Sequence, residues 1–173
     1  MNPILVLPSE KYKESFLEAL AEQDPGQMNP LEGESYKRFN GDFEAFLAYL
    51  SDEREGKNLL EGRVPQTVYW IIDGEKFIGR ISIRHRLNEA LMHIGGHVGY
   101  SIRPSERHKG YGSIALGLVL PKVHELGIEK ALLTCLKTNE ASRRIIEKNG
   151  GIFENEVTND EGLVSLRFWV PTT

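Results

Sequence analysis

The segment RHKGYGS, residues 107–113, contains the residue types that bind anions. Glycines let the backbone approach a ligand with no Cβ in the way, and Arg107, His108 and Lys109 supply donors and positive charge. An apolar run follows at once and predicts a helix, whose first N–H groups lack acceptors and carry partial positive charge. The segment therefore predicts a site for a phosphate-bearing ligand; the alternative is a tight turn with solvated basic side chains.

The glycine spacing does not match the two most common nucleotide-binding patterns. A P-loop places a lysine and a serine or threonine after its last glycine, whereas Gly112 is followed directly by Ser113. The dinucleotide pattern needs a third glycine, and Ala115 occupies that position. Both nucleotide interpretations are therefore disfavoured.

Histidine and cysteine residues offer further chemistry. His85, His93 and His97 fall within one predicted hairpin, so a metal site is one interpretation. No cysteine or HExxH glutamate supports it, and we expect no metal. Cys135 lies in a predicted buried strand, where a small core residue is expected rather than a nucleophile.

The composition is that of an ordinary globular protein. The 173 residues suit one domain with a sizeable core, and 40% are hydrophobic and 27% charged. A formal net charge of -4 argues against a nucleic-acid partner, which would require a basic surface. Because the chain has neither a signal-peptide pattern nor an apolar run that could span a bilayer, we expect a cytoplasmic protein without a membrane partner.

Hydrophobic periodicity predicts the elements that position these residues. Asp73 and Gly74 favour a hairpin turn, and Asn139 is the expected N-cap of its helix. Pro121 lies inside the helix after the basic segment, where we expect a kink or an early end. The expected strands cover residues 3–7, two runs within 66–87, 97–104, 128–136, 151–157 and 163–170, and the expected helices begin near residues 9, 40, 110 and 139.

The order of these elements is β-α-α-βββ-α-β-α-ββ. It predicts an α/β (α+β) fold in which helices cover both faces of one mixed sheet of about seven strands. Residues 22–38 are rich in turn-forming residues and are predicted to form a loop.

Two sequence stretches resemble motifs of the GNAT superfamily of acyl-CoA N-acyltransferases. GYSIRPSERHKGYGSIAL resembles motif A, written [RQ]-x-x-G-x-[GA], with Arg107, Gly110 and Gly112 in the defining positions. LLTCLKTNEASRRIIEKNGGIF resembles motif B. The resemblance covers roughly residues 3–170 and is similar to a bacterial subgroup of predicted acetyltransferases. It implies a single N-acetyltransferase domain with a GNAT-like fold over residues 1–173.

The resemblance also implies an activity and a coenzyme site. Such a protein would be an N-acetyltransferase that moves an acetyl group from acetyl-CoA to a primary amine of a small molecule or peptide, by direct attack in a ternary complex. Its partners would be that amine acceptor and, in a homodimer, a second copy of the chain. The residues that the resemblance assigns to coenzyme binding are Ile102, Arg103, Arg107, His108, Lys109, Gly110, Tyr111, Gly112, Ser113, Asn139 and Ser142.

The chain departs from the family pattern at two catalytic positions. Ile146 stands where many members carry a tyrosine that protonates the departing thiolate. Gly96 stands where some relatives carry a glutamate or histidine base, and the adjacent His97 is our candidate base; alternatively, His97 only packs. A catalytically weak or inactive coenzyme A-binding sensor, or a partner-binding domain with a plain glycine turn, are therefore the alternatives.

The acceptor site is expected to involve the first two helices, their loop and the last hairpin. Acidic residues there would favour a cationic amine, although a solvated acidic surface is the alternative. Aromatic residues could line the pocket or pack in the core. The acidic candidates are Glu32, Glu34, Asp42 and Glu44, and the aromatic candidates are Tyr36, Tyr69 and Trp70.

Overall fold

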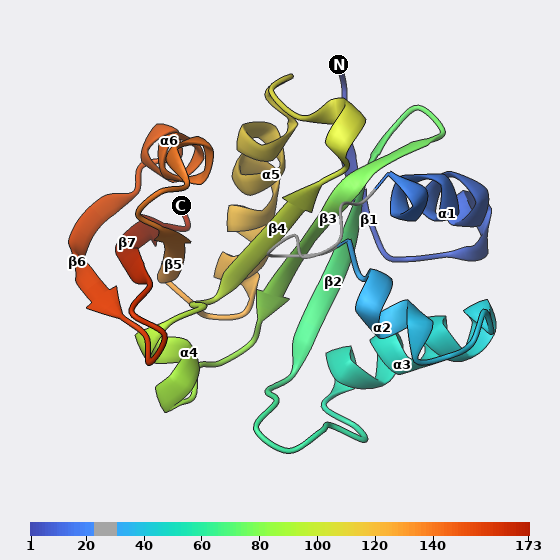
Figure 1. Cartoon of the computed structure of the whole chain (residues 1–173), viewed down its shortest axis with the longest axis horizontal. Helices are drawn as coiled ribbons and strands as arrows, with labels where there is room; N and C mark the ends of the chain where they lie inside the picture. Colours follow the sequence, from blue (N-terminus) through green and yellow to red (C-terminus); the bar gives the residue numbers. More distant parts are fainter. Residues whose placement is uncertain (23–30) are drawn as a thin grey trace.

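The computed structural model describes residues 1–22 and 31–173 (Figure 1). Its strands are β1 (Ile4–Val6), β2 (Gln66–Asp73), β3 (Lys76–Arg84), β4 (Val98–Ile102), β5 (Lys130–Leu136), β6 (Ile152–Thr158) and β7 (Val164–Pro171). Its α-helices are α1 (Lys13–Ala21), α2 (Gly33–Lys37), α3 (Phe43–Glu55), α4 (Glu89–His93), α5 (Tyr111–Glu125) and α6 (Glu140–Lys148). Two short 3-10 helices cover Glu10–Tyr12 and Pro104–Glu106.

The strands form two antiparallel sheets, which confirms the α+β class. One sheet has the order β1-β2-β3-β4 and the other β5-β7-β6. The hairpin predicted at Asp73 joins β2 to β3, with Asp73 opposite Lys76. The described residues contain seven strands, as expected, but these are divided between two antiparallel sheets instead of forming one mixed sheet.

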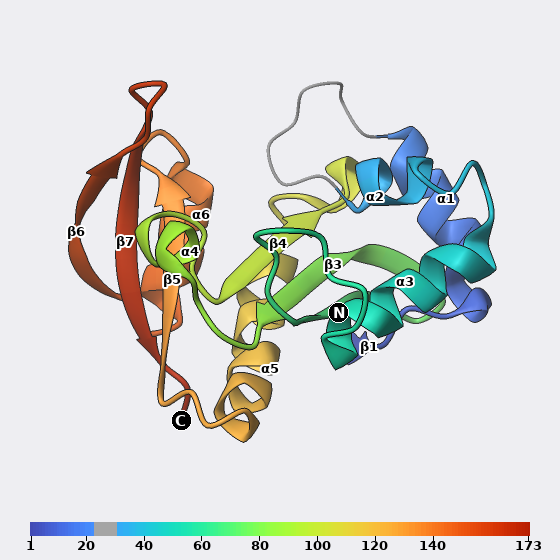
Figure 2. The same ribbon diagram turned by 90° about the horizontal axis from the view of Figure 1, so that it is seen from below.

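The two sheets meet along a short seam between β4 and β5 (Figure 2). An isolated bridge joins Gly96 to Leu133. Next to it, the His97 N–H donates to the Leu132 carbonyl at 2.7 Å, and the Leu132 N–H donates to His97 Nδ1 at 2.9 Å. Beyond this seam no ladder pairs β4 with β5, so the edge of β4 that faces β5 is left open.

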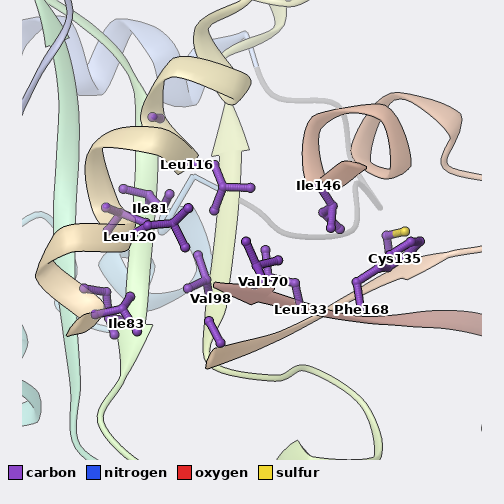
Figure 3. Close-up of a cluster of buried hydrophobic side chains, with 14 of the residues drawn as sticks. Ile81, Ile83, Val98, Leu116, Leu120, Leu133, Cys135, Ile146, Phe168 and Val170 are labelled. Atoms are coloured by element: carbon purple, nitrogen blue, oxygen red, sulfur yellow. The ribbon is translucent and has the colours of Figure 1, made fainter. Parts of the chain in front are cut away.

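One hydrophobic core spans both sheets and explains the course of α5 (Figure 3). Leu116 and Leu120 of this helix pack in the same buried cluster as residues of β3, β4, β5 and β7. The helix passes through Pro121 and ends at Glu125, so the early end that we considered does not occur. The apolar face of α5 is buried, and this packing outweighs the one backbone hydrogen bond that proline removes.

A second core fills the opposite face of the four-stranded sheet. Aromatic rings from α1 and α3 pack on β2, and the rings of Phe16 and Trp70 stack at 4.7 Å between centroids. Trp70 is fully buried, and Tyr36 lies in edge contact with Phe16 and Phe46. Trp70 is therefore a core residue and not part of an acceptor pocket.

Two short helices lie where the sequence did not predict them. Part of the expected loop 22–38 forms α2, and residues 23–30 of this loop lie outside the described residues. The connection before β4 forms α4, capped by the Asn88 side chain, which accepts from the Leu91 N–H at 3.0 Å. In the described part of the chain, no helix combines the length and apolarity needed to cross a membrane.

Candidate functional site

A groove of about 710 Å³ opens between β4, the start of α5 and α6. It contains all of the residues that the sequence assigned to coenzyme binding except Arg103 and Lys109. The lining residues are Val98, Gly99, Tyr100, Ser101, Ile102, Glu106, Arg107, His108, Gly110, Tyr111, Gly112, Ser113, Thr134, Asn139, Ala141, Ser142, Arg144 and Ile145.

The pleat of β4 decides which of its backbone groups face the groove. The His97 carbonyl and the Arg103 N–H are both bonded to β3, at Arg84 and Ile78. Hydrogen-bonding directions alternate along an antiparallel strand, so the N–H and carbonyl groups of the even-numbered residues, including Tyr100 and Ile102, point to the open edge. The backbone groups of Ile102 therefore face the open edge, and those of its neighbour Arg103 face β3.

The side chain of Arg103 is also turned away from the groove. It is buried, donates to the Phe77 carbonyl at 3.1 Å and forms an ion pair with Glu22. The other predicted residue outside the groove lining, Lys109, pairs with Glu106 at 3.0 Å. Hydrogen bonding from Arg103 is the main reason that the pKa of Glu22 is lowered to about 2.

Glu22→Gln should therefore lower stability in a pH-dependent way. The folded-state pKa lies below the ordinary value of 4.5, so the stabilisation is present above pH 4.5 and is lost as the pH falls towards 2. We expect the free energy of unfolding at pH 7 to fall by about 2 kcal/mol, and the difference to vanish near pH 2. Urea unfolding across this range tests it, with the exposed Glu18→Gln on the same helix as control. Equal curves at pH 7 would contradict the role of this pair.

The segment 107–113 has the backbone geometry of an anion cradle. His108 has φ 62° and Gly110 has φ 91°, so two left-handed residues turn the chain just before α5. Gly110 is the N-cap and offers no side chain to the N–H groups of the first turn. Arg107 Nε donates to the Ile102 carbonyl at 3.2 Å, while its Nη2 is buried with no hydrogen-bond partner among the described residues. A buried guanidinium nitrogen without an acceptor, at a helix N-terminus, fits an anionic ligand.

Gly112 is placed where a side chain would not fit without rearrangement. A Cβ on this residue would lie 2.8 Å from Cδ1 of Ile145, which also lines the groove. α5 and α6 are further joined by Asn149, whose Nδ2 donates to the Ser113 carbonyl at 3.2 Å. The start of α5 is therefore held close to the C-terminal end of α6 beside the groove.

Near the start of α6, the hydroxyls of Ser142 and of Tyr100 on β4 form a pair that the sequence did not predict. Asn139 caps the helix as predicted, and its side chain accepts from the Ser142 N–H at 3.0 Å. The Ser142 hydroxyl lies 2.8 Å from the Tyr100 hydroxyl, and burial raises the pKa of Tyr100 to about 12. Ile146, where a tyrosine is common, is fully buried. The structure thus places the protonated phenol of Tyr100 in the groove on β4. This residue lies 46 positions before Ile146, where the family motif would place a tyrosine.

His97, the candidate base, and Cys135 are both buried. His97 is 9% exposed and does not line the groove, and its Nδ1 already accepts from Leu132. Burial, and then the nearby Arg84, lower its pKa below 6.5. Only Nε2 of His97 could take a proton, so its role as a base stays a prediction. Cys135 is buried, which raises its pKa to about 11 and opposes a nucleophilic role.

The acidic residues expected around the acceptor are mostly engaged with other groups. Glu32 is buried and pairs with Arg80 at 2.8 Å. Glu34 pairs with Lys37 at 2.7 Å, and Asp42 caps α3 by accepting from the Ala45 N–H at 2.9 Å.

Comparison with known proteins gives one family. The model of the acetyltransferase (GNAT) domain matches residues 14–152. A search of curated proteins finds no match.

Solved structures share the fold over nearly the whole chain at low sequence identity. A chimera of spermidine N-acetyltransferase from Vibrio cholerae and hSSAT is 14% identical with a TM-score of 0.67, covering 99% of this chain and 96% of that one. An N-acetyltransferase from Staphylococcus aureus Mu50 is 14% identical with a TM-score of 0.65, covering 100% of both chains. A Salmonella typhimurium protein described as an acetyltransferase with its cofactor acetyl-CoA is 14% identical with a TM-score of 0.59, covering 99% and 94%.

Proposed function

The chain belongs to the GNAT acetyltransferase family and is an acyl-CoA-dependent acetyltransferase, and on that premise we propose that it transfers an acetyl group from acetyl-CoA to a primary amine of a small molecule or peptide. The observation that carries the proposal is the buried, unpartnered Nη2 of Arg107 at the start of α5, within a groove large enough for an extended ligand.

The groove residues divide into two groups along its length. The N–H groups at the start of α5, together with Arg107, would hold the diphosphate of coenzyme A. The open backbone edge of β4 would pair with the pantetheine arm, as a further strand would. Asn139 and Ser142, at the start of α6, would hold the same arm from the other side.

The chain's own residues would also supply a hydrogen-bond donor for the carbonyl oxygen and a proton for the departing sulfur. Acetyl-CoA would supply an activated acetyl group as a thioester. The neutral amine would attack the carbonyl carbon, the C–S bond would break, and the surplus proton of the amine would pass to water or to Nε2 of His97. The N–H of Tyr100 points to the open edge of β4 and can donate to a carbonyl oxygen there. The Tyr100 hydroxyl, held against Ser142, keeps a proton at neutral pH that a departing sulfur can take.

Tyr100→Phe should separate this chemistry from coenzyme binding. We expect kcat to fall about 10- to 100-fold, since positioned acids contribute about 10²-fold or more and a thiolate leaves fairly easily. The KM for acetyl-CoA should stay within about threefold, because the ring remains. Steady-state thiol release measures both, with Tyr69→Phe, outside the groove, as control. An unchanged kcat would exclude Tyr100 as the proton donor.

Thermal unfolding with and without acetyl-CoA tests the proposed function. A ligand at 100 times its dissociation constant adds about 2.7 kcal/mol, a rise of several degrees for a chain of this size. Thiol release with a panel of primary amines then tests transfer. Stabilisation without release from any amine would favour a coenzyme A sensor, and no stabilisation would contradict the coenzyme site itself.

A further inference from the structure

A polar strip runs along β3 beside the groove. Arg80, Ser82 and Arg84 alternate with Ile81 and Ile83, which are buried in the core against α5. The three polar residues therefore share the opposite face of the sheet. On β4, the residues opposite Arg80 and Ser82 are Ser101 and Gly99, and both line the groove.

Arg84 is the cation of this strip that lacks an acidic partner. Its Nη1 donates to the carbonyls of Gly95 at 3.0 Å and Gly96 at 2.9 Å. Within residues 1–22 and 31–173 no carboxylate forms an ion pair with it, whereas Arg80 pairs with Glu32. Burial first, and then the charges of Arg80 and Arg63, lower the pKa of Arg84 to about 10, although the nearby Glu32 acts in the opposite direction. A partly buried cation among like charges is in a region that an anion would stabilise.

The guanidinium of Arg84 lies beside the groove. Its Nη2 is 3.8 Å from the point where a Cβ of Gly99 would stand, and Nη1 is 4.0 Å from it. Gly99 has no side chain, so nothing from this residue separates the guanidinium from the lining of the groove. A ligand group that lies against the Cα of Gly99 on this face would therefore meet Nη2, with the Ser82 hydroxyl beside it. This nitrogen makes no hydrogen bond to the Gly95–Gly96 turn.

We propose that Arg84 binds a carboxylate of the acceptor, so that the substrates are primary amines that also bear a carboxylate, as free amino acids do. This inference rests on the proposed acetyltransferase function and defines its acceptor class. Arginine suits the role because its planar donors match the two carboxylate oxygens. The acidic residues that a cationic acceptor would require are largely engaged: Glu32 with Arg80, Glu34 with Lys37 and Asp42 with the first turn of α3.

Matched acceptor pairs test the proposal. Each common amino acid is compared with its primary amide, which keeps the amine and side chain and removes only the negative charge. With acetyl-CoA present, kcat/KM from thiol release should be about 10- to 100-fold higher for the acid in at least one pair. The amide has the less basic amine and hence more of the attacking neutral form, so this comparison is biased against the expected result.

Variants of Arg84 test whether this residue causes the preference for acids over their amides. Arg84→Gln, which keeps a donor for the Gly95–Gly96 turn, should remove the acid-over-amide preference, measured as the ratio of the two kcat/KM values within the same variant. Arg84→Lys should retain part of the preference, and the exposed Arg86→Gln should retain all of it. Stabilisation by acetyl-CoA is measured on each variant to show that the fold and the coenzyme site persist.

The outcomes separate this inference from the proposed function. One outcome is that acetyl-CoA stabilises the protein, but amides or carboxylate-free amines such as spermidine are used as well as the acids. Another is that acetyl-CoA stabilises the protein, but no amino acid is preferred over its amide. Either outcome overturns the carboxylate proposal and leaves the coenzyme site standing. The same holds if Arg84→Gln keeps the full preference. If acetyl-CoA gives no stabilisation at all, both proposals fail together.

Discussion

Gly112→Glu is expected to abolish measurable binding of acetyl-CoA. The new side chain would start 2.8 Å from Cδ1 of Ile145 and would enter the groove at the first turn of α5. It would fill the space meant for the diphosphate and place a negative charge against it. Losing two charge-assisted hydrogen bonds of about 2 kcal/mol each weakens binding by a factor of several hundred. Titration calorimetry with coenzyme A measures the change.

A matched variant separates this local effect from added charge. Leu118→Glu introduces the same side chain on the same helix, at a position that is 40% exposed and outside the groove lining. We expect it to bind coenzyme A as the wild type does. Retained binding in Gly112→Glu, or equal loss in both variants, would contradict the placement of the diphosphate.

Gly96→Ala is expected to cause the largest loss of stability of any substitution considered above. A Cβ at this position would lie 2.2 Å from the Leu132 carbonyl oxygen, which is backbone and cannot move aside easily. The residue also has φ 62°, which adds strain for any side chain. Together these effects should lower the free energy of unfolding by about 3 kcal/mol or more.

Urea denaturation tests this with Gly162→Ala as control. Gly162 has φ 79° and no heavy atom within 4 Å of its Cβ position, so it shares the strain without the clash and should lose only about 1 kcal/mol. Equal losses in the two variants would show that the contact with Leu132 does not matter. The same clash predicts that Gly96→Glu, which would restore an acidic residue found in some relatives, destabilises the protein instead of raising its activity.

The lining of the groove was predictable where it depends on contiguous residues. Arg107, Gly110 and Gly112 form the cradle within one short segment, and Asn139 caps the next helix by a local contact. Arg103 was misplaced because adjacent strand residues point in opposite directions, and the sequence did not fix which of the two faces the open edge.

The remaining features depend on contacts between distant parts of the chain. Tyr100 and Ser142 are 42 positions apart, and no local pattern indicates that their hydroxyls meet. Similarly, the sequence indicates Glu32 as an acceptor-site residue or a solvated surface charge, because composition does not reveal that Arg80 lies within reach. The contact that joins the two sheets depends on the close approach of Gly96 to β5, which a glycine permits but does not by itself predict.

The hydrogen bond between Leu132 and His97 makes the contact between the two sheets sensitive to acid. Nδ1 of His97 can accept from the Leu132 N–H only while it holds no proton. The folded-state pKa lies below 6.5, so this contribution is complete above pH 6.5 and is lost as the pH falls through the folded-state pKa. Acidification should therefore lower the hydrogen-exchange protection factor of the Leu132 N–H before it lowers those in the paired interior of β2 and β3, because the contact between the two sheets opens first.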